Sequence, residues 1–232
     1  MSRGEMLLSI IIPMYNEELT VGNIIDRVKA AVERTGLPTE IIVVDDHSYD
    51  KSLLVAEKRG VKLYSLKQHL GKGYALRAGF AKAQGDVIVT IDSDGSHMPE
   101  ELSEVLAPIL RDEADLVIGS RYMNHKRVAA RRLNAFGVRM FNYFIELFTG
   151  VAITDSQSGY RAMKRDVLQS QKLYSGEYEI ESEMLVKTAR RKFRIAEVPI
   201  SFEQRTYGRS GVDPLLDGSK ILFWIILASV ER

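Results

Sequence analysis

Runs of apolar and β-branched residues alternate with helical patterns through the first 120 residues of the chain. Within each run the apolar residues are consecutive, which is typical of strands covered on both faces of a sheet. Between the runs, apolar residues recur at helical spacing, as at Ile24, Val28 and Val32. This alternation predicts an α/β fold with a parallel, doubly wound sheet. The strands are expected at residues 7–13, 40–45, 61–66, 86–91 and 115–119, and the helices at 19–34, 71–82 and from Pro99 onward.

After Gly119 the pattern changes to longer helical segments. Leu133–Phe148 is rich in Phe, Met, Leu and Tyr, a second helix is expected around Glu179–Arg191, and Ile195–Phe202 has the pattern of a last strand. The chain contains no internal repeat and no low-complexity linker. We therefore expect a single domain over residues 1–232, divided into a nucleotide-binding half (1–120), an acceptor half (121–212) and a C-terminal helix near a membrane (213–232).

The C-terminal run Ile221–Val230 is apolar on all sides. A helix needs about 20 apolar residues to cross a bilayer, and this run is much shorter. It could be a buried terminal helix, a helix docked at the bilayer surface, or the first half of a longer span. We favour a position at the membrane, because Leu133–Phe148 is also unusually apolar and follows a basic segment.

Charge is balanced over the whole chain but uneven along it. Lys and Arg total 32 against 31 for Asp and Glu, so we expect no nucleic-acid partner. The segment Arg121–Arg132 nevertheless holds five basic residues and no acidic one, and Lys187–Arg194 holds five more. Such clusters favour phosphates or an anionic membrane surface, although the second could equally be a solvated helix face. The absence of cysteine excludes disulfides, thiolate metal sites and a thiol nucleophile.

The segment Val87–His97 carries the clearest chemistry. A strand-forming run leads directly into Asp92-Ser93-Asp94, which places two carboxylates at the carboxyl edge of the expected sheet. Open α/β sheets bind ligands at this edge. Two carboxylates so close repel each other unless a cation lies between them, and oxygen ligands favour Mg²⁺ or Mn²⁺, with Ca²⁺ as a further choice. We predict a metal site that holds a phosphate or diphosphate.

Three other motifs are expected near the same edge. In Pro13–Glu17, Tyr15 could stack on a base or ribose, and Asp45–Ser48 follows the second strand. Both could instead be ordinary turns that cap the next helix. In Gly71–Gly79, glycines and Lys72 at a helix N-terminus could hold phosphate oxygens, although the spacing matches neither a Walker A loop nor a dinucleotide fingerprint. Their shared edge favours one common site.

Two alternatives remain from the residues alone. The D-S-D-G-S sequence also matches the aspartyl-nucleophile loop of haloacid-dehalogenase-type phosphatases, but it follows three strands and no later G-D-x-x-x-D acidic pair is present. A turn without any ligand is the other alternative. The four histidines are scattered, and His97, three residues after Asp94, is the best candidate among them for a role at the metal.

The order of the motifs resembles glycosyltransferase family 2, and most closely its dolichyl- and polyprenyl-phosphate hexose synthases. The likeness spans about residues 7 to 225, and its motifs are P-M-Y-N-E, V-V-D-D-H-S, G-K-G-Y-A-L-R-A-G, D-S-D, I-G-S-R-Y and D-S-Q-S-G-Y-R-A. The resemblance implies a GT-A fold with a Rossmann-like sheet. It also implies inverting transfer of a hexose from a GDP- or UDP-sugar to a lipid phosphate, with Mg²⁺ or Mn²⁺, at the cytoplasmic face of the cell membrane.

The resemblance also assigns residues to the donor and to the metal. The residues that would bind the nucleotide-sugar are Pro13, Tyr15, Glu17, Asp45, Lys72, Asp92, Ser93 and Arg205. The metal would be held by Asp92, Asp94 and Ser96. The family often has Gln where this chain has Ser96, which is a shorter donor.

Acceptor and catalytic roles fall mainly on arginines. The acceptor phosphate would be bound by Arg121, Arg131 and Ser210, and the catalytic residues would be Asp94, Arg121, Arg131 and Asp155. Guanidinium groups suit a phosphate because they bind it through two hydrogen bonds. A lipid phosphate is already ionised, so no strong base is needed. If the acceptor were instead a sugar hydroxyl of a growing glycan, a base would be required, and Asp155 is the candidate.

Overall fold

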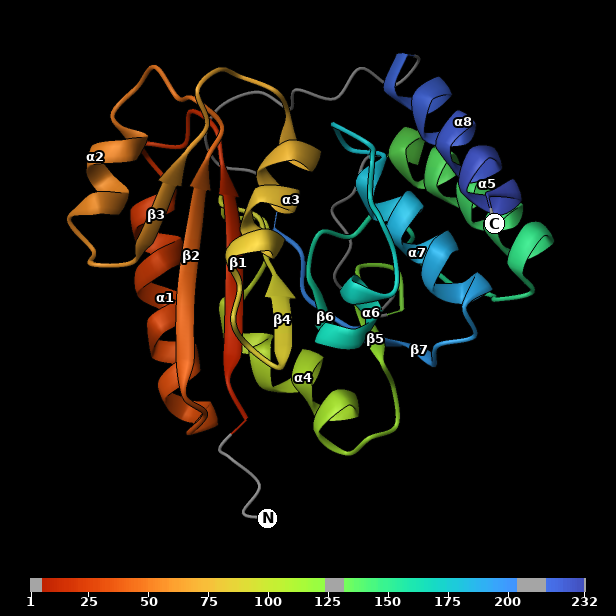
Figure 1. Ribbon diagram of the computed structural model, residues 1–232, viewed down its shortest axis with the longest axis horizontal. Coiled ribbons are helices and arrows are strands. Elements are labelled where there is room, and N and C mark those ends of the chain that lie inside the picture. The colour runs from red at the N-terminus through yellow and green to blue at the C-terminus, as the bar shows by residue number, and fades with distance from the viewer. Residues whose placement is uncertain (1–5, 124–131, 204–215, 232) are drawn as a thin grey trace.

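The computed structural model describes residues 6–123, 132–203 and 216–231, and it is built around one seven-stranded sheet. The strand order is β3-β2-β1-β4-β6-β5-β7 (Figure 1). Only β6 runs antiparallel to its neighbours in this sheet, so the expected α/β architecture with a mostly parallel sheet is confirmed. The strands are β1 (Leu8–Met14), β2 (Thr39–Asp45), β3 (Lys62–Ser65), β4 (Val87–Thr90), β5 (Leu116–Ser120), β6 (Arg161–Lys164) and β7 (Ile195–Pro199).

Helices cover both faces of the sheet, because the strands are apolar on both sides. Along β1, Ile10 and Ile12 belong to the core beneath α1 and α4, whereas Ile11 belongs to the core beneath α3 and α7. The helices α5 and α8 pack side by side on the outside of α7 (Figure 1). The helices are α1 (Val21–Thr35), α2 (Ser52–Glu57), α3 (Lys72–Lys82), the 3-10 turn η1 (Pro99–Glu101), α4 (Leu102–Leu110), α5 (Arg132–Thr149), α6 (Arg165–Gln169), α7 (Ile180–Arg190) and α8 (Leu216–Val230).

The antiparallel strand β6 was not among the strands predicted from the sequence. It inserts between β4 and β5, pairing Thr90 with Arg161 and Ile118 with the same residue from the other side. The strand has four residues, and its sequence R-A-M-K has no apolar run that would mark it. The last strand also ends at Pro199, earlier than expected, and Phe202 forms an isolated bridge with His97 instead.

The C-terminal helix α8 is buried on one side and exposed on the other. Ile221, Ile225 and Ala228 face the core, whereas Phe223 and Val230 are exposed. Among the helices in the described ranges, none is long and apolar enough to cross a bilayer.

Arg161 is a fully buried cation that joins β6 to the segments packed around it. It is 1% exposed, and its guanidinium donates to the carbonyl oxygens of Ser156, Ser158 and Glu181 at 2.7–2.8 Å. It thereby joins the loop before β6 to the first turn of α7. Burial lowers the pKa of Arg161, and the charges of Glu181 and Asp155 oppose that shift. Its role is to hold backbone and not to contact a substrate.

Replacing Arg161 by Leu should destabilise the fold strongly. Three buried carbonyl oxygens would lose their donor, and each such loss costs about 1–3 kcal/mol. We expect a fall of several kcal/mol in the free energy of unfolding, measured by urea denaturation. The control is Arg34→Leu, which removes an exposed arginine from α1 and should change stability by less than about 0.5 kcal/mol. Equal stability of the two variants would contradict this account of Arg161.

Candidate active site

Four strand ends and one helix start meet at the carboxyl edge of the sheet. Parallel pairing of β1 with β2 puts Met14 beside Asp45, and pairing of β1 with β4 puts Ile11 beside Thr90. The residues that follow these strands therefore share one edge, as predicted. The Ser93 hydroxyl joins two of the motifs, since it donates to the Pro13 carbonyl oxygen at 2.8 Å. Ser93, expected to bind the donor, is buried and its hydroxyl is used inside the protein.

The expected nucleoside side of the site is an aromatic stack. The ring of Tyr15 lies parallel to the imidazole of His69, with centroids 3.9 Å apart, and Tyr49 meets Tyr15 edge-on at 6.3 Å. His69 is fixed by Asp46, whose carboxylate pairs with its Nδ1 at 2.7 Å. Asp46 also accepts the backbone N–H groups of Leu70 and Gly71, so it shapes the turn that begins α3. His69 was not anticipated from the sequence.

The two predicted carboxylates on this side also have local roles. Asp45 accepts the Ser48 backbone N–H at 3.1 Å and the Ser65 hydroxyl at 2.8 Å. Glu17 is buried, and its carboxylate accepts the Thr20 hydroxyl at 2.8 Å at the start of α1. Turn formation and donor binding are therefore compatible at these positions, and the donor role stays a prediction.

The D-x-D loop is held in a compact turn. One oxygen of Asp94, Oδ1, accepts both the backbone N–H and the hydroxyl of Ser96, at 3.0 and 2.6 Å. Ser96 is 3% exposed, so its hydroxyl supports Asp94 in this conformation. His97 is also buried, with Nδ1 3.6 Å from Asp92 Oδ2, and burial lowers its pKa. In the described part of the chain neither ring nitrogen of His97 has a hydrogen-bond partner.

Asp92 is paired with the ammonium group of Lys72. Their Oδ1 and Nζ atoms are 2.7 Å apart, and the same Nζ lies 2.8 Å from Glu181 Oε1 on α7. Burial alone would lower the pKa of Lys72, but the two carboxylates outweigh it and raise that pKa above its usual value. Burial alone would raise the pKa of Asp92, but Lys72 above all, together with His97 and Arg121, holds it below its usual value. The Asp92 carboxylate is therefore paired with a cation of the protein itself, the Lys72 ammonium group.

The donor set fits a divalent ion that is shared with a substrate. Among the described residues, no group of three His, Cys, Asp or Glu side chains is placed to hold a metal. Two carboxylates, Asp92 and Asp94, remain, and Mg²⁺ commonly binds one or two carboxylates while substrate phosphates and water complete its shell. These residues therefore suit a metal held together with a diphosphate, and not a metal in an all-protein cage.

The glycines at the start of α3 allow close packing. A methyl group at Gly73 would lie 2.6 Å from the backbone of Gly176, and the Tyr74 N–H donates to the Gly176 carbonyl oxygen at 3.2 Å. At Gly71 a methyl group would collide with the Glu177 carboxylate. The segment before α7 therefore lies against this helix N-terminus. Close packing against residues 176 and 177 therefore explains both glycines of the G-K-G sequence. The phosphate-binding role of this sequence stays a prediction.

Arg121 and Asp155, for which acceptor and catalytic roles were predicted, form an ion pair. The guanidinium donates through Nε and Nη2 to both carboxylate oxygens, at 2.7 and 2.8 Å, and the Arg121 backbone N–H donates to the same carboxylate. Asp155 is fully buried, and its backbone N–H donates to Glu197 on β7. The pair therefore fixes Arg121 in place, with further N–H groups of its guanidinium unused by Asp155. Phe202 lies against the guanidinium at 5.2 Å.

Three predicted residues lie outside the described residues. They are Arg131, Arg205 and Ser210. Their acceptor and donor roles stay predictions.

The family model described as glycosyl transferase family 2 matches residues 9–171, which include β1 through β6 and the D-x-D loop. The chain belongs to glycosyltransferase family 2.

Relatives of this family 2 glycosyltransferase act at lipid phosphates. It is 29% identical over 255 residues to the UDP-N-acetylglucosamine–dolichyl-phosphate N-acetylglucosaminyltransferase of Methanococcus voltae, covering 99% of this chain and 98% of the relative. It is 33% identical to the dolichol-phosphate mannosyltransferase of Pyrococcus furiosus, covering 88% of this chain and 59% of the relative. The resemblance to polyprenyl-phosphate glycosyltransferases is confirmed.

A solved structure supports the GT-A fold. Glucosyl-3-phosphoglycerate synthase from Mycobacterium tuberculosis, solved with Mn²⁺, uridine-diphosphate-glucose and phosphoglyceric acid, superposes with a TM-score of 0.78 at 25% identity. The match covers 98% of this chain and 81% of the other. The fold of a family 2 glycosyltransferase is therefore shown, and a haloacid-dehalogenase-type phosphatase is excluded.

Sequence reasoning missed several residues that build the site. Glu181 and Glu197 lie far along the chain from the groups they touch, so no local pattern marked them. Gly159 lies within the D-S-Q-S-G-Y-R-A motif, but no role was predicted for it. Gly159 is the clearest case, because a methyl group there would lie 2.6 Å from Asp92 Oδ2. The backbone of Gly159 and Tyr160 is held from two strands. The Gly159 carbonyl oxygen accepts the Thr90 hydroxyl on β4, and the Tyr160 carbonyl oxygen accepts the Gly119 N–H on β5. A larger residue at this position would have to displace the Asp92 carboxylate.

Gly159→Ala should weaken nucleotide binding without unfolding the protein. The added methyl group would push the Asp92 carboxylate aside, and misplacement by about 1 Å can cost about 100-fold at a site of this kind. The measurement is calorimetric titration of UDP and GDP in the presence of Mn²⁺. In the control Gly137→Ala, no atom lies near the new methyl group, and binding should be unchanged. Wild-type affinity in Gly159→Ala would show that Asp92 does not serve the nucleotide.

Proposed function

We propose that this family 2 glycosyltransferase transfers a hexose, with inversion, from a GDP- or UDP-sugar to a polyprenyl or dolichyl phosphate. The observation that carries the proposal is Arg121, held by buried Asp155 close enough to the D-x-D loop that its charge lowers the pKa of Asp92. A fixed guanidinium beside a diphosphate anchor is suited to bring an acceptor phosphate to the donor. The lipid-phosphate relatives support the same acceptor class.

Charge balance suggests how the residues divide the work. Asp92 and Asp94 would hold Mg²⁺ or Mn²⁺, which would neutralise the charge that develops on the departing nucleoside diphosphate. Tyr15 and His69 would receive the base. Arg121 would bind the acceptor phosphate through the N–H groups that Asp155 leaves unused. An oxygen of the ionised phosphate then attacks the anomeric carbon opposite the departing diphosphate, so the configuration inverts and no proton has to be removed.

Transfer to a sugar hydroxyl is less well supported. That reaction needs a base, and Asp155 was our candidate. Its carboxylate is 0% exposed and accepts two hydrogen bonds from the Arg121 side chain, so it is engaged as a counter-ion. A small phosphorylated acid, like the one bound in the mycobacterial structure, is a closer competitor, because it would also use Arg121.

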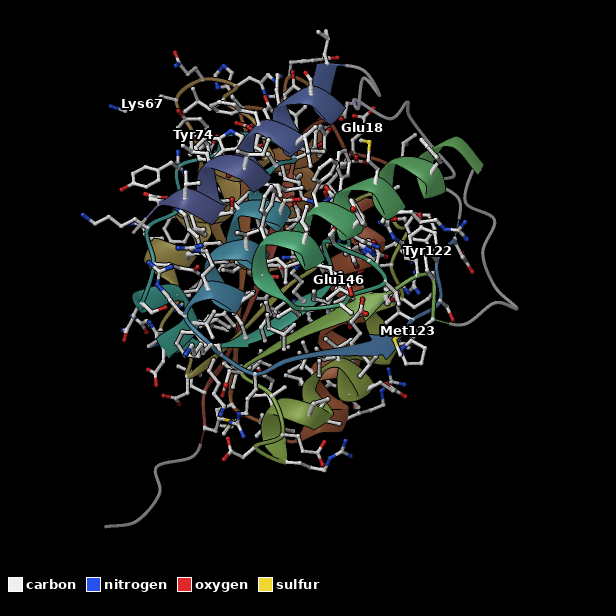
Figure 2. All side chains as sticks on the ribbon, turned by 90° about the vertical axis from the view of Figure 1, so that its right-hand side faces the viewer. Glu18, Lys67, Tyr74, Tyr122, Met123 and Glu146 are labelled. Atoms are coloured by element: carbon white, nitrogen blue, oxygen red, sulfur yellow. The ribbon has the colours of Figure 1, made fainter. Side chains whose placement is uncertain are left out.

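An exposed apolar surface on α5 and α8 favours the lipid acceptor. On α5, Phe136, Tyr143 and Leu147 share one exposed face, while Val138 and Ile145 face the core. On α8, Phe223 and Leu227 are exposed in the same way. The two helices run side by side across one side of the molecule (Figure 2).

Membrane docking through this α5/α8 surface is part of the proposal. In sequence, α5 is preceded by the basic segment Arg121–Arg132, and α8 is preceded by Arg205 and Arg209. An apolar helix face flanked by basic residues binds anionic bilayer surfaces in two ways. Its apolar side chains are buried among the lipids, and its basic residues are attracted to the anionic head groups. We propose peripheral attachment at the cytoplasmic face of the membrane, where the lipid phosphate would enter from the bilayer.

The donor and acceptor are tested together in a transfer assay. Wild-type protein with Mn²⁺ should move sugar from one of GDP-mannose, UDP-glucose or UDP-N-acetylglucosamine to polyprenyl phosphate, and mild acid should release the sugar from the product. Asp94→Ala should lower the rate by at least about 100-fold, because the metal carboxylate is lost. The control is Asp26→Ala, an exposed carboxylate on α1. Transfer only to phosphoglycerate, or full activity in Asp94→Ala, would refute the proposal.

Vesicle binding tests the α5/α8 surface. The double variant Phe136→Glu and Phe223→Glu places charge at side chains that are 73% and 60% exposed, so folding should be unaffected. We expect it to lose most binding to vesicles with anionic lipid in a sedimentation assay, since each buried aromatic contributes about 1.5–3 kcal/mol. Leu54→Glu, at a 56% exposed position on α2, is the matched control and should bind like wild type. Loss of self-association in place of vesicle binding would identify the surface as a contact between copies.

A further inference from the structure

The position of Lys72 is unfavourable unless carboxylates compensate for it. Lys72 is the first residue of α3, where the helix N-terminus carries partial positive charge, and no acidic residue lies in the first turn. Its side chain is only 17% exposed. Two carboxylates from other elements meet its ammonium group, Asp92 at 2.7 Å and Glu181 at 2.8 Å. The Lys72 ammonium group is therefore bound by two carboxylates, and either one alone would compensate its single positive charge.

The two carboxylates differ in what else they can do. Asp92 lies in the D-x-D loop and is 24% exposed, so a ligand can reach it. Glu181 is 5% exposed and lies on α7, where its backbone carbonyl is held by Arg161. Asp92 can therefore exchange its partner for a cation from solution, whereas Glu181 stays beside Lys72.

We propose that Lys72 is a resident cation for Asp92, that a divalent ion displaces it, and that Glu181 keeps the displaced ammonium in place. The inference rests on the proposed function only in taking Asp92 and Asp94 as the carboxylates of the metal. Without the divalent ion, Lys72 compensates the charge of Asp92. With it, Lys72 keeps one buried partner, and the cost of a buried cation without a partner is avoided. Lys72 and Glu181 are thus positioning residues that set the metal affinity of the site.

The test is a titration of metal-free protein with Mn²⁺ alone, followed by the electron paramagnetic resonance signal of free Mn²⁺. Lys72→Met should bind Mn²⁺ about tenfold more tightly than wild type, because a competing charge has gone. Glu181→Gln should bind about threefold more weakly, because Lys72 then depends on Asp92 alone. Lys72→Gln is a second neutral variant in case Met disturbs the fold, and thermal unfolding checks both.

A double variant separates this exchange from simple attraction between Glu181 and the metal. In the Lys72→Met background, Glu181→Gln should change Mn²⁺ affinity by less than about twofold, since its effect passes through Lys72. The matched control is Lys62→Met, which removes a lysine paired with Glu40 at the far edge of the sheet and should leave Mn²⁺ affinity unchanged. Wild-type affinity in both Lys72 variants would overturn the exchange, and an undiminished Glu181 effect in the double variant would overturn the role of Glu181.

Failure of the proposed function would look different. The titration contains neither donor nor acceptor, so its result does not depend on which sugar is transferred. An absence of transfer by wild-type protein, with the expected Mn²⁺ affinities, would strike the proposed function and leave the exchange intact.

Discussion

Compensation of negative charge at one sheet edge is the constraint on which this site depends. The parallel strands β1, β2 and β4 and the loop before β6 bring carboxylates to that edge, and three of these carboxylates have a specific partner. Asp92 is balanced by Lys72, Asp155 by Arg121, and Asp46 by His69 and two backbone N–H groups. Because these partners come from α3, β5 and the turn before α3, the charges also fix how the elements meet. The carboxylates at this edge therefore also organise the local fold.

The arginines Arg161 and Arg121 differ in the groups to which they donate hydrogen bonds. Arg161 donates only to backbone carbonyl oxygens and is closed to ligands. Arg121 is bound by a carboxylate on one edge, which orients it and leaves donors for an incoming phosphate. Two arginines in neighbouring sequence motifs thus have opposite roles. Composition alone cannot distinguish them, since the difference lies in the atoms that surround each guanidinium.

Sequence patterns predicted the parts of the molecule whose signal lies in residues close together in the sequence. The parallel strands, the strand-end motifs and the paired carboxylates Asp92 and Asp94 all follow from local patterns, and their common edge follows from the rules of parallel sheets. The strand β6 was missed because four residues without an apolar run give no periodic signal. The contacts of Gly73 with Gly176, and of Lys72 with Glu181, were missed because they join residues about one hundred positions apart. Only the packed structure brings such partners together.

The antiparallel strand β6 has a consequence for how the enzyme can move. It enters the sheet at the edge where the parallel strands leave it, so the loop that carries Asp155 and Gly159 arrives beside the D-x-D loop without a linker. Strands β4 and β5 are thereby joined through β6 by a continuous ladder of hydrogen bonds. The parts of the molecule on either side of β6 therefore cannot separate by a hinge motion. Substrate entry and release are therefore expected to involve the loops at this edge of the sheet and not a separation of β4 from β5.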